Sequence, residues 1–334
     1  MSRNHRCGRA GAASTALAAS ALLLAAPAAE AEGTGLIFVS NEKSDTITVL
    51  DGATDTVLRT IETCGRPRDM EWNEDKTRIY VACADDNEIG IVDIEGFKTV
   101  DAIPDIEEPE AFEIDAEFEY LYVSNEEDAA LSVVDLGTRE VVAMIELGEE
   151  PEGVMISKDG GTVWVTAEAS NLVHVIDVES REVLADILVD TRPRRFAAPP
   201  DEREIWVSAE LAGKVNIIDP ASYEVVESIA FLPRGFRPEQ VTPVDVLITG
   251  DGQTAYVALG RANHVAVVDV PSREIRKYIL VGSRAWGLTL TADERKLYVT
   301  NGLSDDITII DTAASQTIKS VSVGQVPYTV LIDD

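Results

Sequence analysis

The sequence predicts an all-β fold, a seven-bladed β-propeller of four-stranded antiparallel blades, and three observations carry that prediction. An aromatic residue inside a short β-branched run returns seven times, at Phe38, Tyr80, Tyr122, Trp164, Trp206, Tyr256 and Tyr298. An aspartate follows each one thirteen residues later, at Asp51, Asp93, Asp135, Asp177, Asp219, Asp269 and Asp311. The aromatic residues are 42 residues apart except for a single step of 50. Such a register indicates one supersecondary unit that is copied and packs on its neighbours.

Each unit reads as four short strands with no helical periodicity. In one copy, strand-forming runs occupy residues 153–157, 163–166, 173–176 and 182–188, and turns or polar loops separate them. These runs predict a small antiparallel meander. Four strands per 42 residues is typical of a propeller blade, whereas a β-helix has shorter rungs and leucine-rich repeats need helices or leucine frames.

The two ends of the chain predict how the ring closes. The strand at residues 36–40 matches the second strand of a unit, and the strand at residues 328–332 matches the first strand. Together they complete one blade, so we expect the C-terminal strand to pair with the three N-terminal strands. This closure leaves no long exposed strand edge.

Residues 1–31 are predicted to be a signal peptide. Arg3, Arg6 and Arg9 precede an Ala/Leu-rich stretch at about residues 16–26, and Ala29-Glu30-Ala31 offers a cleavage site. The apolar stretch is too short to span a bilayer comfortably. We therefore expect export to the periplasm and one propeller domain in residues 32–334, with an insertion at about residues 231–241.

The chain is strongly acidic, with 60 acidic and 28 basic side chains and a net charge of −32. This charge repels phosphate backbones and anionic lipid surfaces, so neither nucleic-acid binding nor membrane insertion is expected. The acidic residues are spread along the whole chain, and we attribute them to solubility. We expect a monomer.

Propeller geometry predicts which residues surround the mouth of the central channel. The loops that lead into the innermost strands lie on one face, so the residues before those strands ring the channel. In the repeat register these positions are Arg66/Arg68, Glu108/Glu110, Glu150/Glu152, Arg192/Arg194, Thr242/Val244, Arg284/Trp286 and Val326/Tyr328. The insertion falls in the same class of loop and adds Arg234, Phe236 and Arg237.

The arginines are concentrated at this mouth. The predicted ligand- or partner-binding residues are Arg66, Arg68, Arg192, Arg194, Arg234, Phe236, Arg237, Arg284, Trp286 and Tyr328, with Arg195 beside them. Guanidinium groups suit carboxylate or phosphate, and aromatic rings stack planar ligands. The pattern predicts a small anionic ligand or an acidic partner surface. The alternative is internal pairing with Glu108, Glu110, Glu150 and Glu152.

Several short motifs resemble a known family. Tyr122-Val-Ser-Asn125 and Tyr298-Val-Thr-Asn301 resemble the YVTN family of seven-bladed propellers across the chain after residue 31. Arg237-Pro-Glu239 and residues 255–260, 262–269 and 299–302 are similar to the periplasmic subfamily associated with PQQ-dependent catabolism. The sequence departs from the motif at Cys83, Ala167 and Ala209. The resemblance implies a periplasmic protein associated with quinoprotein alcohol oxidation.

Known catalytic patterns are absent from the sequence. It contains no G-x-S-x-G, P-loop or dinucleotide-binding fingerprint, and His174 and His264 lack metal-ligand spacing. The recurring aspartates are expected to accept hydrogen bonds in turns rather than bind metal. No adjacent cysteine pair of the quinoprotein dehydrogenase type occurs. We expect no cofactor and no bound metal.

These observations lead to one expected function and one alternative. The expected function is a non-enzymatic accessory of quinoprotein alcohol catabolism that binds a small anionic ligand or a periplasmic protein partner. The alternative is a propeller enzyme of the lactonase or hydrolase type, with a metal in the central channel.

Two local features complete the predictions. Cys64 and Cys83 flank the first-to-second strand hairpin of one blade, close enough for a disulfide in an oxidising compartment. The insertion is predicted to carry binding residues, because a longer surface loop costs little stability and loops on rigid scaffolds often hold binding sites. The alternative is a plug that packs down onto the channel and supports the fifth and sixth blades.

Overall fold

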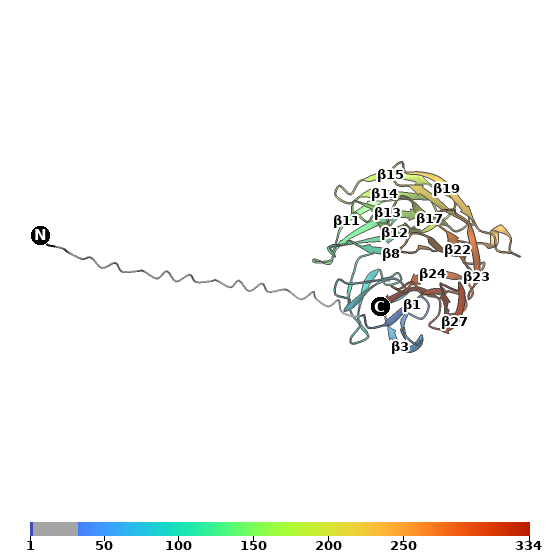
Figure 1. Ribbon diagram of the computed structural model, residues 1–334, viewed down its shortest axis with the longest axis horizontal. Helices are drawn as coiled ribbons and strands as arrows, with labels where there is room; N and C mark the ends of the chain where they lie inside the picture. The colour runs from blue at the N-terminus through green and yellow to red at the C-terminus, as the bar shows by residue number, and fades with distance from the viewer. Residues whose placement is uncertain (3–32) are drawn as a thin grey trace. The chain divides into compact units, whose positions relative to one another are not determined.

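The computed structural model describes residues 1–2 and 33–334, so nearly all of the predicted signal peptide and its cleavage site lie outside the described residues. Residues 33–334 form one compact unit. This unit consists of seven four-stranded antiparallel sheets, which follow one another as blades around a ring (Figure 1). The predicted seven-bladed propeller is confirmed.

We number the blades in chain order, starting with the blade that contains both ends of the propeller. The innermost strands of blades 1 to 7 are β28 (Pro327–Asp333), β4 (Pro67–Trp72), β8 (Pro109–Ile114), β12 (Pro151–Ile156), β16 (Pro193–Ala197), β20 (Val246–Ile248) and β24 (Ala285–Leu290). The second strands are β1 (Leu36–Asn41), β5 (Arg78–Cys83), β9 (Tyr120–Asn125), β13 (Thr162–Ala167), β17 (Ile205–Ala209), β21 (Thr254–Ala258) and β25 (Lys296–Asn301).

The two outer layers follow the same order. The third strands are β2 (Thr46–Asp51), β6 (Glu88–Asp93), β10 (Ala130–Asp135), β14 (Leu172–Asp177), β18 (Lys214–Asp219), β22 (His264–Asp269) and β26 (Asp306–Asp311). The outermost strands are β3 (Thr56–Glu62), β7 (Lys98–Ile103), β11 (Glu140–Glu146), β15 (Val183–Leu188), β19 (Glu224–Ala230), β23 (Ile275–Leu280) and β27 (Gln316–Ser322). The short 3-10 helix η1 (Pro238–Gln240) lies in the insertion, and no helix of the described residues is long and apolar enough to cross a membrane.

Blade 1 closes the ring as predicted. Strand β28 pairs antiparallel with β1, with Leu36 opposite Asp333 and Val39 opposite Val330. Thr34 adds a clasp just before β1, because its backbone N–H and its hydroxyl donate to Asp333 Oδ2 at 2.7 and 2.6 Å. The last strand of the chain therefore supplies the innermost edge of the first blade.

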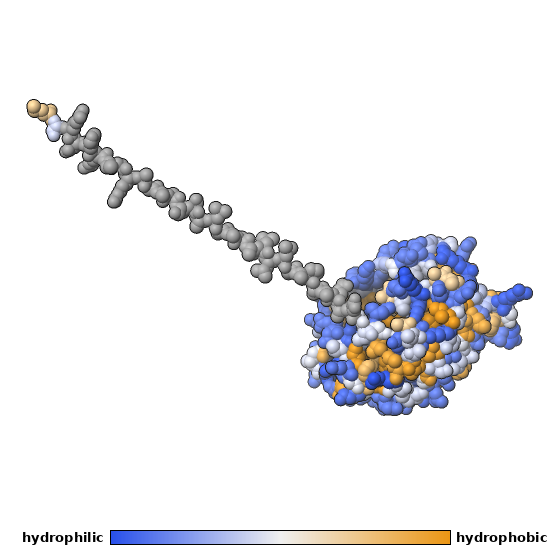
Figure 2. Space-filling model, turned by 60° about the horizontal axis from the view of Figure 1, so that its bottom comes forward, coloured by the Kyte–Doolittle hydropathy of each residue, from blue (hydrophilic) through white to orange (hydrophobic). Residues whose placement is uncertain are grey.

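The core lies between neighbouring blades. The recurring aromatic residues occupy the second strands, and Phe38, Trp206 and Tyr298 are fully buried. Outer strands instead expose apolar side chains, among them Leu58 on β3 and Leu184 on β15. Figure 2 shows that apolar side chains gather in patches on one face of the molecule, bordered by hydrophilic residues.

The recurring aspartates stabilise turns, as the sequence predicted. Each stands at the end of a third strand and accepts a backbone N–H from the turn that follows, at 2.6–2.9 Å. Asp51, for example, accepts from Thr54 at 2.8 Å. These hydrogen bonds lower the pKa of Asp51 below its usual value. The repeat period therefore includes the turn that links each third strand to its outer strand.

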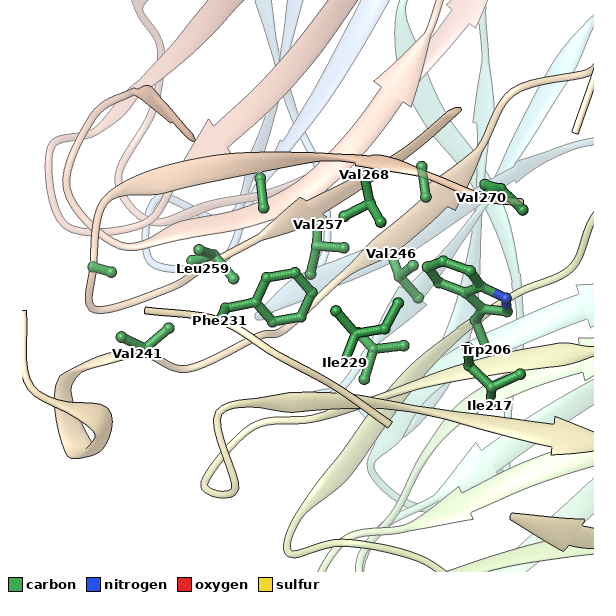
Figure 3. Close-up of a cluster of buried hydrophobic side chains, with 14 residues drawn as sticks. Trp206, Ile217, Ile229, Phe231, Val241, Val246, Val257, Leu259, Val268 and Val270 are labelled. Carbon is green, nitrogen blue, oxygen red and sulfur yellow. The ribbon is translucent and has the colours of Figure 1, made fainter. Parts of the chain in front are cut away.

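The insertion packs between blades 5 and 6. Phe231 and Val241 flank it, and both are buried in a cluster that contains Trp206 and Val257 (Figure 3). Phe236 is partly buried against the same cluster, and its ring meets the His264 ring edge-on at 5.6 Å between centroids. This packing agrees with one part of the alternative, the support of the fifth and sixth blades. The other part, a plug over the channel, is not observed, because no residue of 231–241 lines the cavity at the channel mouth.

Cys64 and Cys83 form a disulfide with Cα atoms 5.6 Å apart. Cys83 ends β5, and Cys64 precedes β4 on the same blade. Both sulfur-bearing side chains are buried, with Cys83 fully enclosed. The bond therefore links the entry of blade 2 to its second strand.

Replacing both cysteines by alanine is expected to lower the free energy of unfolding by about 3 kcal/mol, because the disulfide restricts the unfolded chain. Guanidinium unfolding of the variant and of the oxidised wild type measures this difference. Rapid alkylation of both thiols in the folded protein, without prior reduction, would contradict the disulfide.

Candidate active site

The residues that precede the innermost strands adopt a left-handed backbone conformation, which orients their side chains at the channel mouth. Arg66, Arg192 and Arg284 have φ values of 53°, 62° and 65°. Their backbone N–H groups donate to side-chain oxygens of Asp45, Asn171 and Asn263 at 3.1, 2.9 and 2.8 Å. Each acceptor lies 21 residues earlier, in the loop between the second and third strands of the preceding blade. The repeat thus builds the same turn around the mouth.

A buried hydroxyl connects most neighbouring blades just below this turn. Thr166 on β13 donates to the carbonyl oxygen of Arg194 in the next blade at 2.8 Å, and it accepts the N–H of Gly153 at 2.8 Å. Equivalent donations from Ser40, Ser124, Ser208 and Thr300 reach Arg68, Glu152, Val244 and Tyr328. Gly153 has no side chain because a Cβ there would collide with the carbonyl oxygen of Arg194. These hydroxyls fix the backbone of the channel-lining strands.

The residues held in this way surround a cavity at the channel mouth, which we call the mouth chamber. Its volume is about 310 Å³. The predicted site residues that line it are Arg66, Arg68, Arg192, Arg194, Arg284, Trp286 and Tyr328. Glu42, Glu126, Glu152 and Glu168 complete most of its polar wall.

The mouth arginines form ion pairs inside the chamber. Arg66 binds Glu108 at 2.6 Å and Glu110 at 3.3 Å, and Arg68 also binds Glu110. Arg194 binds Glu152 at 2.9 Å and also contacts Glu168, and Arg68 lies 3.9 Å from Glu152. The internal pairing considered as an alternative therefore occurs for Glu108, Glu110 and Glu152, while Glu150 forms no ion pair among residues 33–334.

Four glutamates at the channel mouth were missed by the sequence analysis, although the repeat register contains them. Glu42, Glu126, Glu168 and Glu210 follow the second strands of blades 1, 3, 4 and 5 at the same repeat position. Arg192 contacts Glu168 at 2.6 Å and Glu210 at 3.2 Å. Applying the 42-residue register to the loops after the second strands, and not only to those before the innermost strands, would have found them.

Burial shifts the acidity of these carboxyl groups in different directions. Burial and the neighbouring charge of Glu152 raise the pKa of Glu168 to about 8, although Arg194 and Arg192 oppose the shift. Burial acts in the same sense on Glu152, but Arg194, Arg68 and Arg195 outweigh it and hold the pKa of Glu152 well below its usual value. The chamber therefore contains one carboxyl group that exchanges its proton near neutral pH beside one that stays ionised. Such a pair is suited to general acid–base chemistry.

Tyr328 lies at the floor of the chamber on the closing strand β28. Its hydroxyl accepts from Arg68 at 3.1 Å and from Arg195 at 2.6 Å, and it donates to Glu152 at 2.9 Å. The Arg68 guanidinium also stacks 4.6 Å from the centre of the ring. Trp286 stands beside Tyr328, with ring centroids 5.6 Å apart.

Three buried nitrogen atoms at the chamber have no hydrogen-bond partner among the described residues. They are Nε of Arg68, Nε of Arg194 and Nε1 of Trp286, and of these Arg68 Nε forms an ion pair with Glu42 at 3.2 Å. Arg194 and Arg284 stack on Trp286 at 4.6 and 4.7 Å from its ring. A ligand with acceptor oxygens would satisfy donors of this kind, because an unpaired buried donor is unfavourable.

A second cavity of about 180 Å³ lies on the other side of Tyr328 and Trp286, which line both cavities. Its ionisable side chains are Asp69, Glu71, Glu113, Asp245 and Arg195. Burial and the charge of Asp69 raise the pKa of Glu113 to about 8. Burial also raises the pKa of Asp245 to about 6. The channel thus changes from an arginine-rich mouth to an acidic interior.

The carboxylates that come closest to a metal-binding set do not fit a metal ion well. Oxygen atoms of Glu108, Glu110 and Glu126 lie within 4.8 Å of one another. Arg66 already pairs with Glu108 and Glu110, and Arg68 pairs with Glu110. A metal ion would have to approach through these guanidinium charges, so no step of a reaction is assigned to a metal here.

The insertion contributes nothing to the lining of the mouth chamber. Arg234 and Arg237 are exposed, and Arg237 pairs with Glu239 at 3.2 Å. Phe236 packs against the core cluster between blades 5 and 6. The structure therefore separates these three predicted binding residues from the other seven.

Solved structures of several other proteins share this fold. A periplasmic gluconolactonase from Pseudomonas aeruginosa superposes with a TM-score of 0.75 at 17% identity, covering 90% of this chain and 99% of the other. A propeller from Bacteroides uniformis, assigned provisionally as a 6-phosphogluconolactonase, gives 0.72 at 14% identity, with coverages of 89% and 98%. A dihydro-heme d1 dehydrogenase gives 0.68 at 13% identity, with coverages of 89% and 75%.

No protein-family model matches the sequence, and no protein with a curated description matches it either. The likeness to solved structures is therefore one of fold. It nevertheless corrects one expectation, that the chain is not an enzyme, because proteins named as a lactonase and a dehydrogenase are built on this propeller. The absence of a short catalytic motif does not argue against an enzyme, because the residues that line the channel come from blades far apart in the chain.

Replacing Thr166 by valine is expected to lower the free energy of unfolding by about 1–3 kcal/mol, because the Gly153 N–H and the Arg194 carbonyl oxygen lose their shared partner. Thr166→Ser keeps the hydroxyl and is the matched control. Denaturant unfolding compares the three proteins, and equal stability of the valine variant and the wild type would contradict the role of the hydroxyl.

Proposed function

We propose that the protein is a lactone hydrolase whose reaction takes place in the mouth chamber. The observation that carries the proposal is Glu168, a buried carboxyl group with a pKa of about 8 that lines a cavity rich in arginine. Hydrolysis of a lactone needs a base for the attacking water and positive charge for the developing oxyanion. Both are present within one small space.

The proposed reaction uses groups of this chain alone. Ionised Glu168 removes a proton from water, the resulting hydroxide attacks the lactone carbonyl carbon, and the ring C–O bond then breaks. The same proton passes from Glu168 to the departing ring oxygen, so water and lactone give a hydroxy acid. Arg192, whose side chain is 40% exposed, contacts Glu168 and is placed to stabilise the oxyanion and the carboxylate product.

The fold neighbours and the family resemblance support the same proposal from separate directions. The gluconolactonase from Pseudomonas aeruginosa is named as an enzyme of this class. The resemblance to the YVTN family, and to its subfamily associated with PQQ-dependent catabolism, suggests a setting beside quinoprotein oxidation in the periplasm. Oxidation of a cyclic hemiacetal carbon yields a lactone, so a lactonase would consume a product of such oxidation. We extend the proposal to a monomeric periplasmic protein, directed there by a signal peptide at residues 1–31.

The alternative from the sequence placed a metal in the channel, and the proposal differs on this point. Two of the three clustered glutamates, Glu108 and Glu110, are engaged by Arg66 and Arg68, so hydrolysis is assigned to Glu168 without a metal. A contact with a protein partner of a quinoprotein oxidation system is compatible with this assignment, and we propose it only for surfaces outside the mouth chamber.

The test is hydrolysis of glucono-δ-lactone and a panel of other lactones, measured above the spontaneous rate. Glu168→Gln is expected to lower kcat/KM about 100-fold or more, as loss of a general base does. Glu179→Gln, at an exposed turn residue, is the control and should keep full activity. Wild-type kcat/KM should rise with pH through about 8, because the base must be ionised, and the glutamine variant should lose this rise.

Two results would overturn the proposal. One is the absence of hydrolysis above background for every lactone with correctly folded protein. The other is activity that disappears on chelation and returns with a divalent cation, which would restore the metal-dependent alternative.

A further inference from the structure

The ring of glutamates that follows the second strands is interrupted on blades 2, 6 and 7. The residues that follow the second-strand motif are Glu42, Ala84, Glu126, Glu168, Glu210, Gly260 and Gly302 in blades 1 to 7. The last two blades therefore carry glycine where four others carry glutamate. A Cβ at Gly260 would approach Thr242 too closely, whereas a Cβ at Gly302 would meet its nearest neighbours at ordinary distances of 3.7–3.9 Å. Sterics thus explain the first glycine and leave the second unexplained.

This sector of the rim contains a second hollow beside the mouth chamber. It is lined by Arg261, Asn263, Ser283, Arg284 and Leu303, and its volume is about 450 Å³. Arg284 and Leu303 also line the mouth chamber, so the two spaces are adjacent. We call this space the rim hollow.

Positive charge exceeds negative charge around the rim hollow. Arg261 is exposed and forms no ion pair among residues 33–334, and Arg284 has a single carboxylate partner, Glu210, at 3.0 Å. Glu210 is also shared with Arg192 at 3.2 Å and Arg194 at 3.3 Å. Burial lowers the pKa of Arg284, and the charges of Arg194 and Arg261 act in the same direction.

We propose that the rim hollow binds a second anionic group of the substrate, a carboxylate or a phosphate, between Arg261 and Arg284. The inference rests on the proposed lactonase function and names its substrate class: lactones of sugar acids or sugar phosphates that carry a charged group away from the reacting ring. The guanidinium forks supply donors for either oxyanion. Leu303, 76% exposed, gives an apolar wall along the carbon chain between the two sites.

The proposal explains why position 302 carries glycine and not glutamate. A glutamate there would stand near Arg284, whose Cγ lies 3.8 Å from the position of a Cβ at Gly302. It would supply the carboxylate that four other blades possess and would neutralise the positive charge of the hollow. Its absence leaves Arg284 available to an anion from outside.

The experiment measures binding of stable hydroxy acids by isothermal titration calorimetry, without turnover. Gluconate carries one charged group, glucarate carries two carboxylates, and 6-phosphogluconate carries a carboxylate and a phosphate. We expect at least one doubly substituted acid to bind about tenfold or more tightly than gluconate, as one additional charge-assisted contact allows. Comparing glucarate with 6-phosphogluconate tells which anion the hollow prefers.

Variants test whether the additional affinity for the doubly substituted acids arises in the rim hollow. Arg261→Gln should remove most of the advantage of the doubly substituted acids and leave gluconate binding nearly unchanged, while Arg295→Gln, at an 85% exposed side chain paired with Asp293, should change neither. Gly302→Glu should abolish the advantage, and Gly302→Gln, of equal size without the charge, should retain part of it. Thermal unfolding verifies that each variant is folded.

The outcomes distinguish failure of the rim-hollow proposal from failure of the proposed lactonase function. Equal affinity for gluconate, glucarate and 6-phosphogluconate, or full retention of the advantage in Arg261→Gln, would overturn the rim hollow even if lactones are hydrolysed. Selective binding that depends on Arg261, found in a protein that hydrolyses no lactone, would sustain the hollow and reject the proposed function.

Discussion

The channel site depends on one repeated interaction, the hydrogen bond from a buried hydroxyl on a second strand to the innermost strand of the next blade. Its acceptors include the carbonyl oxygens of Arg68, Glu152, Arg194 and Tyr328, whose side chains form the walls and floor of the mouth chamber. A bulge in the innermost strand leaves backbone groups that its own sheet does not pair, and the hydroxyl satisfies them. The same hydrogen bonds therefore join neighbouring blades and fix the backbone that carries the site residues.

The mouth chamber brings many arginine and glutamate side chains together at low solvent exposure. Burying an ion pair costs desolvation energy that attraction only partly returns, so such pairs are poor sources of stability. Here the guanidinium groups share carboxylates in a network, and Tyr328 adds a hydroxyl that contacts both signs of charge. The network contributes little to stability, but it holds hydrogen-bond donors in fixed positions around a cavity. This combination favours a functional role of the network over a purely structural one.

The sequence predicted the fold and the position of the arginines because both follow the 42-residue period. Side-chain partners were harder to predict, because Arg284 meets Glu210 from a blade two places away and 74 residues distant. The four glutamates after the second strands were missed for a simpler reason, since only one class of loop was placed in the register. The insertion was predicted to reach the mouth, but Phe236 buries its ring between blades 5 and 6 instead. Burial of the apolar Phe236 side chain sets the path of the insertion, and the amino-acid composition of the loop does not predict this path.

We propose that this propeller binds its substrate in the arginine-lined mouth chamber. A crystal structure of the protein with gluconate tests this location. We expect the ligand carboxylate to contact chamber arginines, Arg192 or Arg284 among them, and its carbon chain to point toward Leu303. Ordered gluconate in the acidic cavity beyond Tyr328, or on the outer face between β23 and β27, with the mouth chamber empty, would contradict it.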